Sequence, residues 1–138
     1  MNVSKDLEDL ATYVLGLGSG HDLARAYFVG SGSEANEAAL KMARQYFVEK
    51  GYMGRKHFVA RRQAYHGNTL GAMTVSSNLA RRVPYEDILM TDVSFVSPAY
   101  DYQYTREGET EGQFAARLVD EVEAEFKRIG PEKIVSLM

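Results

Sequence analysis

The chain has 138 residues, of which 45% are hydrophobic and 25% charged, so one ordinary domain with a real core is expected. Its net charge of −3 argues against binding to nucleic acids or anionic membranes, because both require clustered, uncompensated Lys and Arg. It contains no cysteine, and its three histidines are far apart in the sequence, so no disulfide and no metal site are predicted.

The N-terminal thirty residues predict one helix and one strand. The start, MNVSKDLEDL, is charged and lacks a long apolar run, so it predicts neither a signal peptide nor a membrane span. Ser4 is a suitable N-cap for a helix whose apolar residues follow helical spacing as far as Gly16. After a Gly/Ser/His loop, residues 25–29 (RAYFV) are rich in aromatic and β-branched side chains and predict a short strand.

A second helix is predicted to begin in the Gly-Ser-Gly-Ser turn at residues 30–33. Its apolar residues recur at intervals of three and four between positions 35 and 47, and Gly51 ends it. A strand at 57–60 (HFVA) then leads into RRQAYHGNT, a predicted loop because Gly67 and Asn68 interrupt both periodicities.

The remaining elements complete an alternating pattern. A short helix of small residues is predicted at 69–76, a strand at 93–96 (VSFV) and another strand at 134–138 (IVSLM). Between them, residues 110–113 (TEGQ) form a capping-box pattern before a helix that extends to Gly130. This alternation predicts an α/β fold, a three-layer α/β/α sandwich with a mainly parallel sheet. No repeat or low-complexity linker marks a domain boundary.

The Gly-Ser-Gly-Ser turn is a candidate anion site. A helix start has N–H groups without partners and a partial positive charge, and glycines let an anion approach it. The turn also matches the dinucleotide pattern G-x-G-x-x-A, but Arg61 and Arg62 stand where an NAD site needs an acidic residue. An NADP site, in which these arginines would bind the 2′-phosphate, remains an alternative. The purely structural alternative is a tight turn in which Ser31 or Ser33 is an ordinary N-cap.

The loop AYHGNT adds an aromatic ring to this site. In a parallel α/β unit, the loops that follow neighbouring strands emerge at one edge of the sheet. The helix start and the ring of Tyr65 are therefore predicted to share a cleft. An anionic group attached to a flat ring would suit such a cleft.

These two segments carry a resemblance to a known family. SGSEANEAALKMAR (residues 31–44) and YHGNTLGAM (residues 65–73), in this order and about thirty residues apart, resemble the class III (ω-type) aminotransferases. Those are fold type I enzymes that use pyridoxal 5′-phosphate, so the resemblance implies part of a fold type I large domain. It implies six cofactor-binding residues: Ser31, Gly32, Ser33, Tyr65, His66 and Gly67.

The resemblance also implies the roles of these residues. Gly32 and Ser33 would supply backbone amides and a hydroxyl to the cofactor phosphate, with Ser31 close by. Tyr65 would stack on the pyridine ring, Gly67 would let the backbone approach, and His66 would pack behind the cofactor. Glu34 and Glu37 are expected to face solvent and to complement the positive helix start. Lys41 corresponds to a surface residue of the family.

The implied activity is transfer of an amino group between an amine or amino acid and a 2-oxo acid or aldehyde. In the family, the Asp that pairs with the pyridine nitrogen and the Lys that binds the cofactor lie beyond the last strand predicted here. Residues 1–138 are therefore expected to form a partial large domain, without the N-terminal segment, the second half of that domain and the C-terminal small domain. No catalytic residue is expected in it, and the isolated chain is expected to be inactive.

Three further expectations concern the oligomeric state, the cellular location and the alternative functions. Unpartnered apolar helix faces predict a homodimer or a higher homo-oligomer. An intracellular location is expected, cytoplasmic rather than mitochondrial. The alternatives to a transaminase are a non-catalytic binding or scaffolding remnant of the fold and an NADP-binding oxidoreductase domain.

Overall fold

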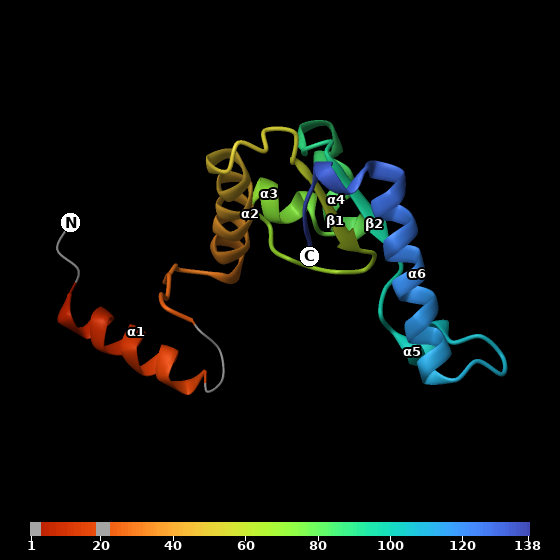
Figure 1. Cartoon of the computed structure of the whole chain (residues 1–138), viewed down its shortest axis with the longest axis horizontal. Helices are drawn as coiled ribbons and strands as arrows, with labels where there is room; N and C mark the ends of the chain where they lie inside the picture. The colour runs from red at the N-terminus through yellow and green to blue at the C-terminus, as the bar shows by residue number, and fades with distance from the viewer. Residues whose placement is uncertain (1–3, 19–22) are drawn as a thin grey trace. The chain divides into compact units, whose positions relative to one another are not determined.

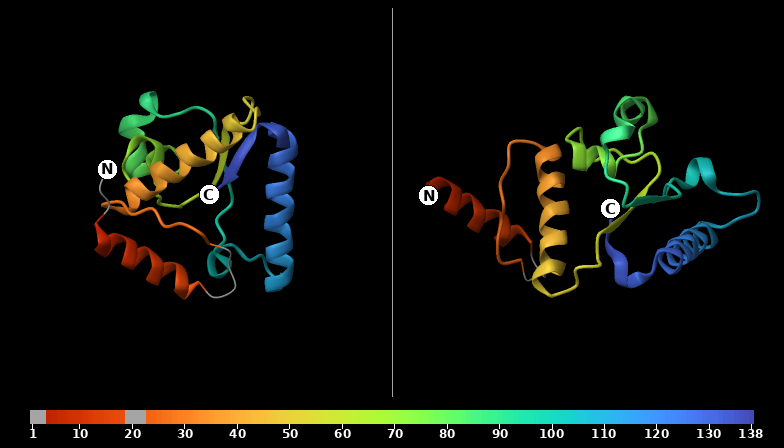
Figure 2. Two further views of the ribbon diagram at one scale, coloured as in Figure 1. Left: turned by 60° about the vertical axis from the view of Figure 1, so that its left-hand side comes forward. Right: turned by 90° about the horizontal axis from the view of Figure 1, so that it is seen from above.

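The computed structural model describes residues 4–18 and 23–138. They cluster into two compact units, Met1–Gly30 and Ser31–Met138, although no change of composition marks this boundary in the sequence. The first unit contains helix α1 (Lys5–Leu17), which extends one residue beyond the predicted end at Gly16. The second unit contains the sheet, the remaining helices and the whole candidate site (Figures 1 and 2).

The second unit alternates helices and strands along the chain. Its long helices are α2 (Gly32–Glu49) and α6 (Glu111–Ile129), and its strands are β1 (His57–Arg61), β2 (Val93–Val96) and β3 (Ile134–Leu137). The short elements are the α-helices α3 (Leu70–Thr74), α4 (Leu79–Arg82) and α5 (Asp101–Tyr104), and the 3-10 helices η1 (Val83–Ile88) and η2 (Pro131–Lys133).

The sheet has the order β2-β1-β3, and both pairs are parallel. Phe58 of β1 pairs with Val93 of β2 and with Ser136 of β3, so β1 is covered on both edges. The three predicted strands at these positions and the parallel arrangement are confirmed. Because the strands are parallel, their carboxyl ends meet at one edge of the sheet.

Side chains that alternate along the strands build one core on each face of the sheet. On one face, Phe58 and Ala60 pack with Leu40 of α2. On the other face, Val59 and Val96 pack with the α6 side chains, among them Phe126. Helices α2 and α6 thus lie on opposite sides of the sheet (Figure 1), which confirms the three-layer α/β/α sandwich.

The capping and glycine signals in the sequence correctly predicted helix ends in α2 and α6. Thr110 and Gln113 form the complete capping box at the start of α6, and Gly130 at its end has a positive φ of 97°. Gly51, just after α2, has a φ of 82°, the left-handed conformation that glycine adopts without a Cβ penalty. Helix α3 lies inside the range predicted for the small-residue helix.

The predicted strand at residues 25–29 is wrong. Among the described residues, no strand pairs with this segment, and it has no regular secondary structure. Tyr27 is 71% exposed, so the apolar side chains that suggested a strand are not buried against a core. Strand propensity alone does not make a strand, because a strand is stabilised by hydrogen bonds and packing across a sheet.

Candidate functional site

The first turn of α2 presents backbone amides that the rest of the described chain leaves open. Ser31 is the N-cap, and its Oγ accepts a hydrogen bond from the Glu34 amide at 3.2 Å. The amides of Gly32 and Ser33 donate no hydrogen bond to any residue in 4–18 or 23–138. A Cβ placed on Gly32 would meet no atom within 4 Å, so this helix start is open to an anion.

Gly67 lies directly against this helix start. A Cβ on Gly67 would be 2.6 Å from Oγ and 2.8 Å from Cα of Ser33, and the φ of Gly67 is +137°. Both the distance and the backbone conformation require glycine at this position. The two motifs, far apart in the sequence, are therefore in contact in the structure.

The hydroxyl of Ser33 is engaged by the loop. It accepts a hydrogen bond from the Asn68 amide at 3.1 Å and donates one to Asn68 Oδ1 at 3.2 Å. A hydroxyl has one proton to donate, so the donors still available to an anion here are the backbone amides of Gly32 and Ser33.

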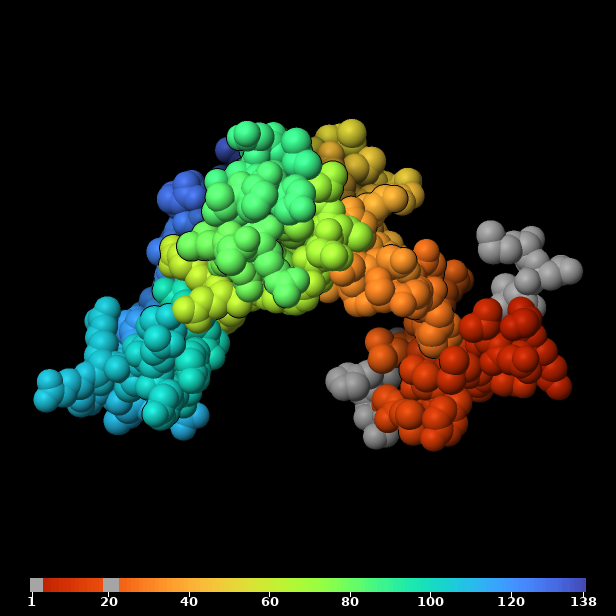
Figure 3. All heavy atoms as spheres, turned by 180° about the vertical axis from the view of Figure 1, so that it is seen from behind, coloured from red at the N-terminus to blue at the C-terminus, as the bar shows by residue number. Residues whose placement is uncertain are grey.

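Tyr65 carries an exposed ring beside Gly67. The residue is 54% exposed, and the Arg81 guanidinium lies 5.2 Å from the ring centroid, a cation–π contact. Tyr65 and Arg81 line a pocket of about 420 Å³. Its other lining residues are Gly67, Asn68, Leu70, Met73, Ala80, Pro84 and Tyr85. Figure 3 shows the face of the molecule on which α3, α4 and η1 lie, in green.

His66 is held by its backbone and has a buried ring nitrogen. Its N–H donates to Ser76 Oγ at 2.8 Å, and its carbonyl accepts from Asn36 Nδ2 at 2.6 Å. Burial lowers the pKa of the imidazole below its ordinary value of 6.5, which favours the neutral ring. Within the described part of the chain, Nε2 is buried without a hydrogen-bond partner. Because buried polar atoms are normally paired, this nitrogen distinguishes His66 within the loop.

The structure also identifies residues that the sequence analysis missed. Glu37, predicted to face solvent, is half-buried, and its carboxylate accepts hydrogen bonds from Thr69 and Ala72; that prediction is wrong. Asn36 and Glu37 follow Ser33 by three and four positions, so they share its face of the helix, and this spacing could have indicated them. No sequence signal indicated that Arg81 contacts Tyr65.

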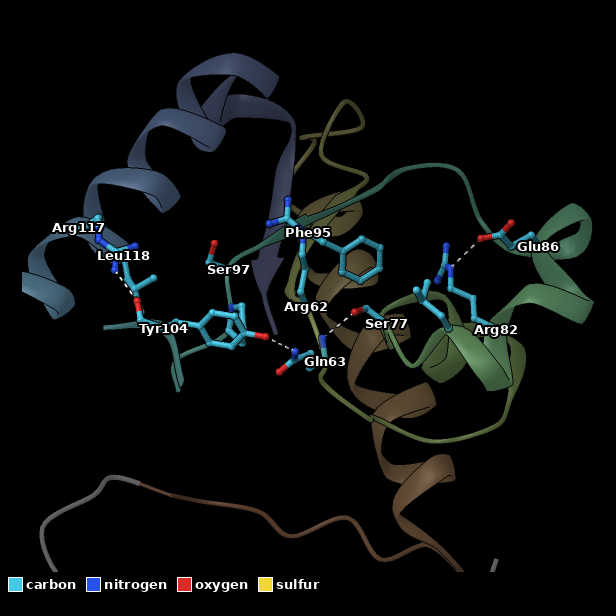
Figure 4. Close-up of a pocket in the computed structure, with 12 residues that line it drawn as sticks. Arg62, Gln63, Ser77, Arg82, Glu86, Phe95, Ser97, Tyr104, Arg117 and Leu118 are labelled. Atoms are coloured by element: carbon cyan, nitrogen blue, oxygen red, sulfur yellow. Dashed lines mark hydrogen bonds and ion pairs between the residues drawn. The ribbon is translucent and has the colours of Figure 1, made fainter. Parts of the chain in front are cut away.

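A second pocket, of about 700 Å³, opens at the carboxyl ends of β1 and β2 (Figure 4). Its lining includes three arginines, Arg62, Arg82 and Arg117, which come from three different segments. Each of them pairs with a carboxylate: Arg62 with Glu121 at 3.7 Å, Arg82 with Glu86 at 3.7 Å and Arg117 with Glu109 at 2.7 Å. The positive charge in this pocket is therefore largely neutralised by the protein itself.

The arginine pair behind the NADP alternative has other partners. Arg61 donates to the Ser97 carbonyl at 3.1 Å, and Arg62 forms the ion pair with Glu121. Both contacts tie the end of β1 to the segment after β2 and to α6. A structural role accounts for the two arginines without a nucleotide.

The fold and these motifs together define a parallel α/β domain in which an open helix start contacts the loop that carries Tyr65. The family model for class III aminotransferases matches residues 3–135, and the chain belongs to this family. It is 46% identical over 115 residues to an uncharacterized aminotransferase of Schizosaccharomyces pombe, covering 83% of this chain and 25% of that protein. It is 35% identical over 136 residues to the mitochondrial gamma aminobutyrate transaminase 1 of Solanum lycopersicum, covering 94% and 25%.

Solved structures agree with this assignment. An omega-transferase from Vibrio fluvialis JS17 superposes with a TM-score of 0.88 at 27% identity, covering 99% of this chain and 31% of that one. An amine transaminase from an uncultivated Pseudomonas species, in its PLP-bound form, gives a TM-score of 0.91 at 27% identity, with 99% and 30% covered. The fold is thus that of part of the fold type I large domain.

The chain spans about a quarter of the length of the curated relatives it matches. Among the described residues, no helix has the length and apolar composition needed to cross a bilayer.

Proposed function

We propose that this chain forms the pyridoxal phosphate-binding part of an aminotransferase. The enzyme would move an amino group between an amine or amino acid and a 2-oxo acid or aldehyde. The observation that carries the proposal is the contact between Ser33 and Gly67, which brings an open helix start and the loop bearing Tyr65 together. Pyridoxal phosphate has a phosphate for the first and a flat ring for the second.

The residues present fit both ends of the cofactor. The amides of Gly32 and Ser33, at the positive end of α2, would hold the phosphate, with Ser31 shaping the turn. Tyr65 would stack on the ring, while Arg81 steadies it by the cation–π contact. When bound, the cofactor supplies an electron sink for bond breaking next to the amine nitrogen.

The residue that binds the cofactor covalently is proposed to lie outside this chain. No lysine is among the described residues that line the pocket of Tyr65 and Gly67. Lys41 is exposed and lines a separate groove with Leu40 and Phe58. The 138 residues alone are therefore proposed to be inactive, and the choice of substrates to depend on other parts of the enzyme.

Assembly and location are part of the same proposal. Met42 and Tyr46 of α2 are 55% and 58% exposed, and Val119 of α6 is 64% exposed. These exposed apolar side chains support association into a homodimer or a higher homo-oligomer. A cytoplasmic location is proposed; the related gamma aminobutyrate transaminases of Solanum lycopersicum include a mitochondrial and a chloroplastic enzyme.

The test is a titration of the chain with pyridoxal 5′-phosphate, followed by the amide NMR signals of Gly32 and Ser33 and by cofactor absorbance. Ser33→Asp places a negative charge at the phosphate position, and we expect it to weaken binding at least about tenfold. Ser4→Asp, at the exposed N-cap of α1, is the matched control, because Asp is an equally good N-cap.

The outcomes separate the candidate functions. Binding that Ser33→Asp abolishes and Ser4→Asp leaves unchanged supports the proposal. Binding that is insensitive to both substitutions places the cofactor elsewhere and defeats the site assignment. A response to NADP without one to pyridoxal phosphate would favour the oxidoreductase alternative. Specific pyridoxal phosphate binding by a longer form of the protein that has no transaminase turnover would favour a non-catalytic remnant.

A further inference from the structure

The carboxylate of Glu37 joins α2 to the start of α3. Its Oε2 accepts a hydrogen bond from Thr69 Oγ1 at 2.7 Å and another from the Ala72 amide at 3.2 Å. The donors lie 32 and 35 positions away in the sequence, so the contact is tertiary. Hydrogen bonds to an ionised acceptor are stronger than neutral ones, and partial burial strengthens them further.

The backbone beside this carboxylate is shaped to receive it. A Cβ on Gly71 would lie 2.6 Å from both Oε1 and Oε2 of Glu37. Gly71 is buried inside α3, where alanine would be the better helix former. Close approach of the Glu37 carboxylate accounts for glycine at this position.

Glu37 has no competing charged partner among residues 4–18 and 23–138. None of the ion pairs in this part of the chain includes it, and its two hydrogen-bond donors both belong to the segment after the ring-bearing loop. The half-buried carboxylate therefore interacts mainly with Thr69 and with the Ala72 amide of α3. Its removal would leave the Ala72 amide without a partner.

The contacts of Glu37 complete a row along one face of α2. Ser33 holds the Asn68 amide, Asn36 holds the His66 carbonyl, and Glu37 holds Thr69. The three α2 residues stand at i, i+3 and i+4, so a single helical face holds three residues of the segment 66–69. Of the three α2 residues, Glu37 is the farthest along the helix from Gly32.

We propose that Glu37 is a positioning residue for the cofactor site. It does not touch the proposed cofactor-binding atoms. It holds Thr69, and through it keeps Asn68 and Gly67 seated on Ser33, so that the helix start and the ring of Tyr65 stay at a fixed separation. The proposal rests on the proposed function, because the separation matters only if one ligand spans both groups.

The test compares Glu37→Ala with Glu37→Gln and with Glu49→Ala, an exposed glutamate in the last turn of the same helix. Two readouts are taken: amide hydrogen exchange of the cofactor-free chain, and its affinity for pyridoxal 5′-phosphate. For Glu37→Ala, we expect faster exchange at Ala72 and also at Asn68, whose amide is bonded to Ser33 and not to Glu37. Loss of a charge-assisted anchor predicts roughly tenfold weaker cofactor binding.

The conservative variant and the control sharpen this result. One oxygen of Glu37 accepts both hydrogen bonds, so the carbonyl of Glu37→Gln can replace it and should restore affinity to within about threefold. Glu49→Ala should match the unsubstituted chain. Gly71→Ala is a second route to the same effect, because its Cβ displaces the carboxylate without removing it, and it should also speed exchange at Asn68.

Either of two results overturns the inference. Unchanged Asn68 exchange in Glu37→Ala means that the loop does not depend on Glu37. Equal acceleration at Val59, in the centre of the sheet, means that the substitution only destabilises the whole fold. If the unsubstituted chain does not bind pyridoxal phosphate, the proposed function falls, and exchange at Asn68 relative to Val59 still decides whether Glu37 positions the loop.

Discussion

The two long helices begin in different ways, and the difference separates structure from function. Helix α6 is capped within four residues: the Gln113 amide donates to Thr110 Oγ1 at 3.3 Å, and the Thr110 amide donates to Gln113 Oε1 at 2.9 Å. Helix α2 has only the Ser31 cap, and its first turn meets a loop more than thirty positions away. A closed start stabilises a helix, whereas an open start next to a distant loop can accept a ligand.

The two helices also differ in how their charged side chains are paired. Arg117 pairs with Glu109 just before α6, and Arg128 pairs with Glu125 within it. The hydrogen bonds from the arginines lower the pKa of both glutamates to about 2. The first two turns of α2 instead contact the loop through the hydroxyl of Ser33, the amide of Asn36 and the carboxylate of Glu37.

The largest effect should come from breaking the contact between the α2 start and the loop. Gly67→Ala introduces a Cβ at 2.6 Å from Ser33 Oγ in a backbone conformation with positive φ. We expect it to lower the free energy of unfolding by about 2–5 kcal/mol and to weaken binding of pyridoxal phosphate. Urea denaturation and the cofactor titration measure the two effects.

Gly32→Ala is the matched control for this substitution. A Cβ on Gly32 meets nothing within 4 Å, and alanine is a better helix former than glycine. We expect unchanged stability or a gain of at most about 1 kcal/mol. If Gly67→Ala were as stable as Gly32→Ala, the close seat of the loop on Ser33 would be contradicted.

A smaller effect compares the two caps directly. Ser31→Ala and Thr110→Ala each remove one side-chain cap and should each cost about 1 kcal/mol of folding stability. Only Ser31→Ala should also weaken cofactor binding, since Thr110 caps the helix on the other face of the sheet. Equal effects of both variants on affinity would show that cap loss acts through global stability alone.

The same regions show which secondary-structure elements can be predicted from the sequence. Periodicity and caps predicted α6 closely, because its start is determined by Thr110 and Gln113, which are three residues apart. Strand β1 was predicted at 57–60, and its apolar residues Phe58, Val59 and Ala60 are buried. Residues 25–29 have a similar composition but no strand beside them in the described chain, and propensity carries no information about a partner.

The candidate site was predictable only in part, for the same physical reason. The motif pair identified the two segments, and the structure brings them together at Ser33 and Gly67. The contacts of Glu37 with Thr69 and of Arg81 with Tyr65 depend on tertiary geometry that no short pattern encodes. The cofactor roles of Ser31, Gly32, Ser33, Tyr65, His66 and Gly67 stay predictions until a binding experiment tests them.

The smallest predicted effect is a difference in acid sensitivity between the loop at His66 and the glutamate–arginine pairs of α6. Burial lowers the pKa of His66 below 6.5, so its contribution to stability is complete above pH 6.5 and is lost as the pH falls through the folded-state value. Glu109 and Glu125 have folded-state pKa values of about 2, below the ordinary 4.5, so their contributions persist above pH 4.5 and are lost only as the pH falls toward 2. The loop at His66 should therefore loosen first.

Site-resolved NMR between pH 7.5 and 3 would measure this order. We expect the signals of His66 and Asn68 to begin to shift as the pH falls below 6.5, while those of Arg117 and Arg128 stay constant until below pH 4.5. His57 is an internal reference: burial lowers its pKa as well, but it lies in the sheet and is hydrogen-bonded to Ser94. If His66 titrated at or above 6.5, its ring would not be buried as described, and the loop that contacts the start of α2 would not be more sensitive to acid than the ion pairs of α6.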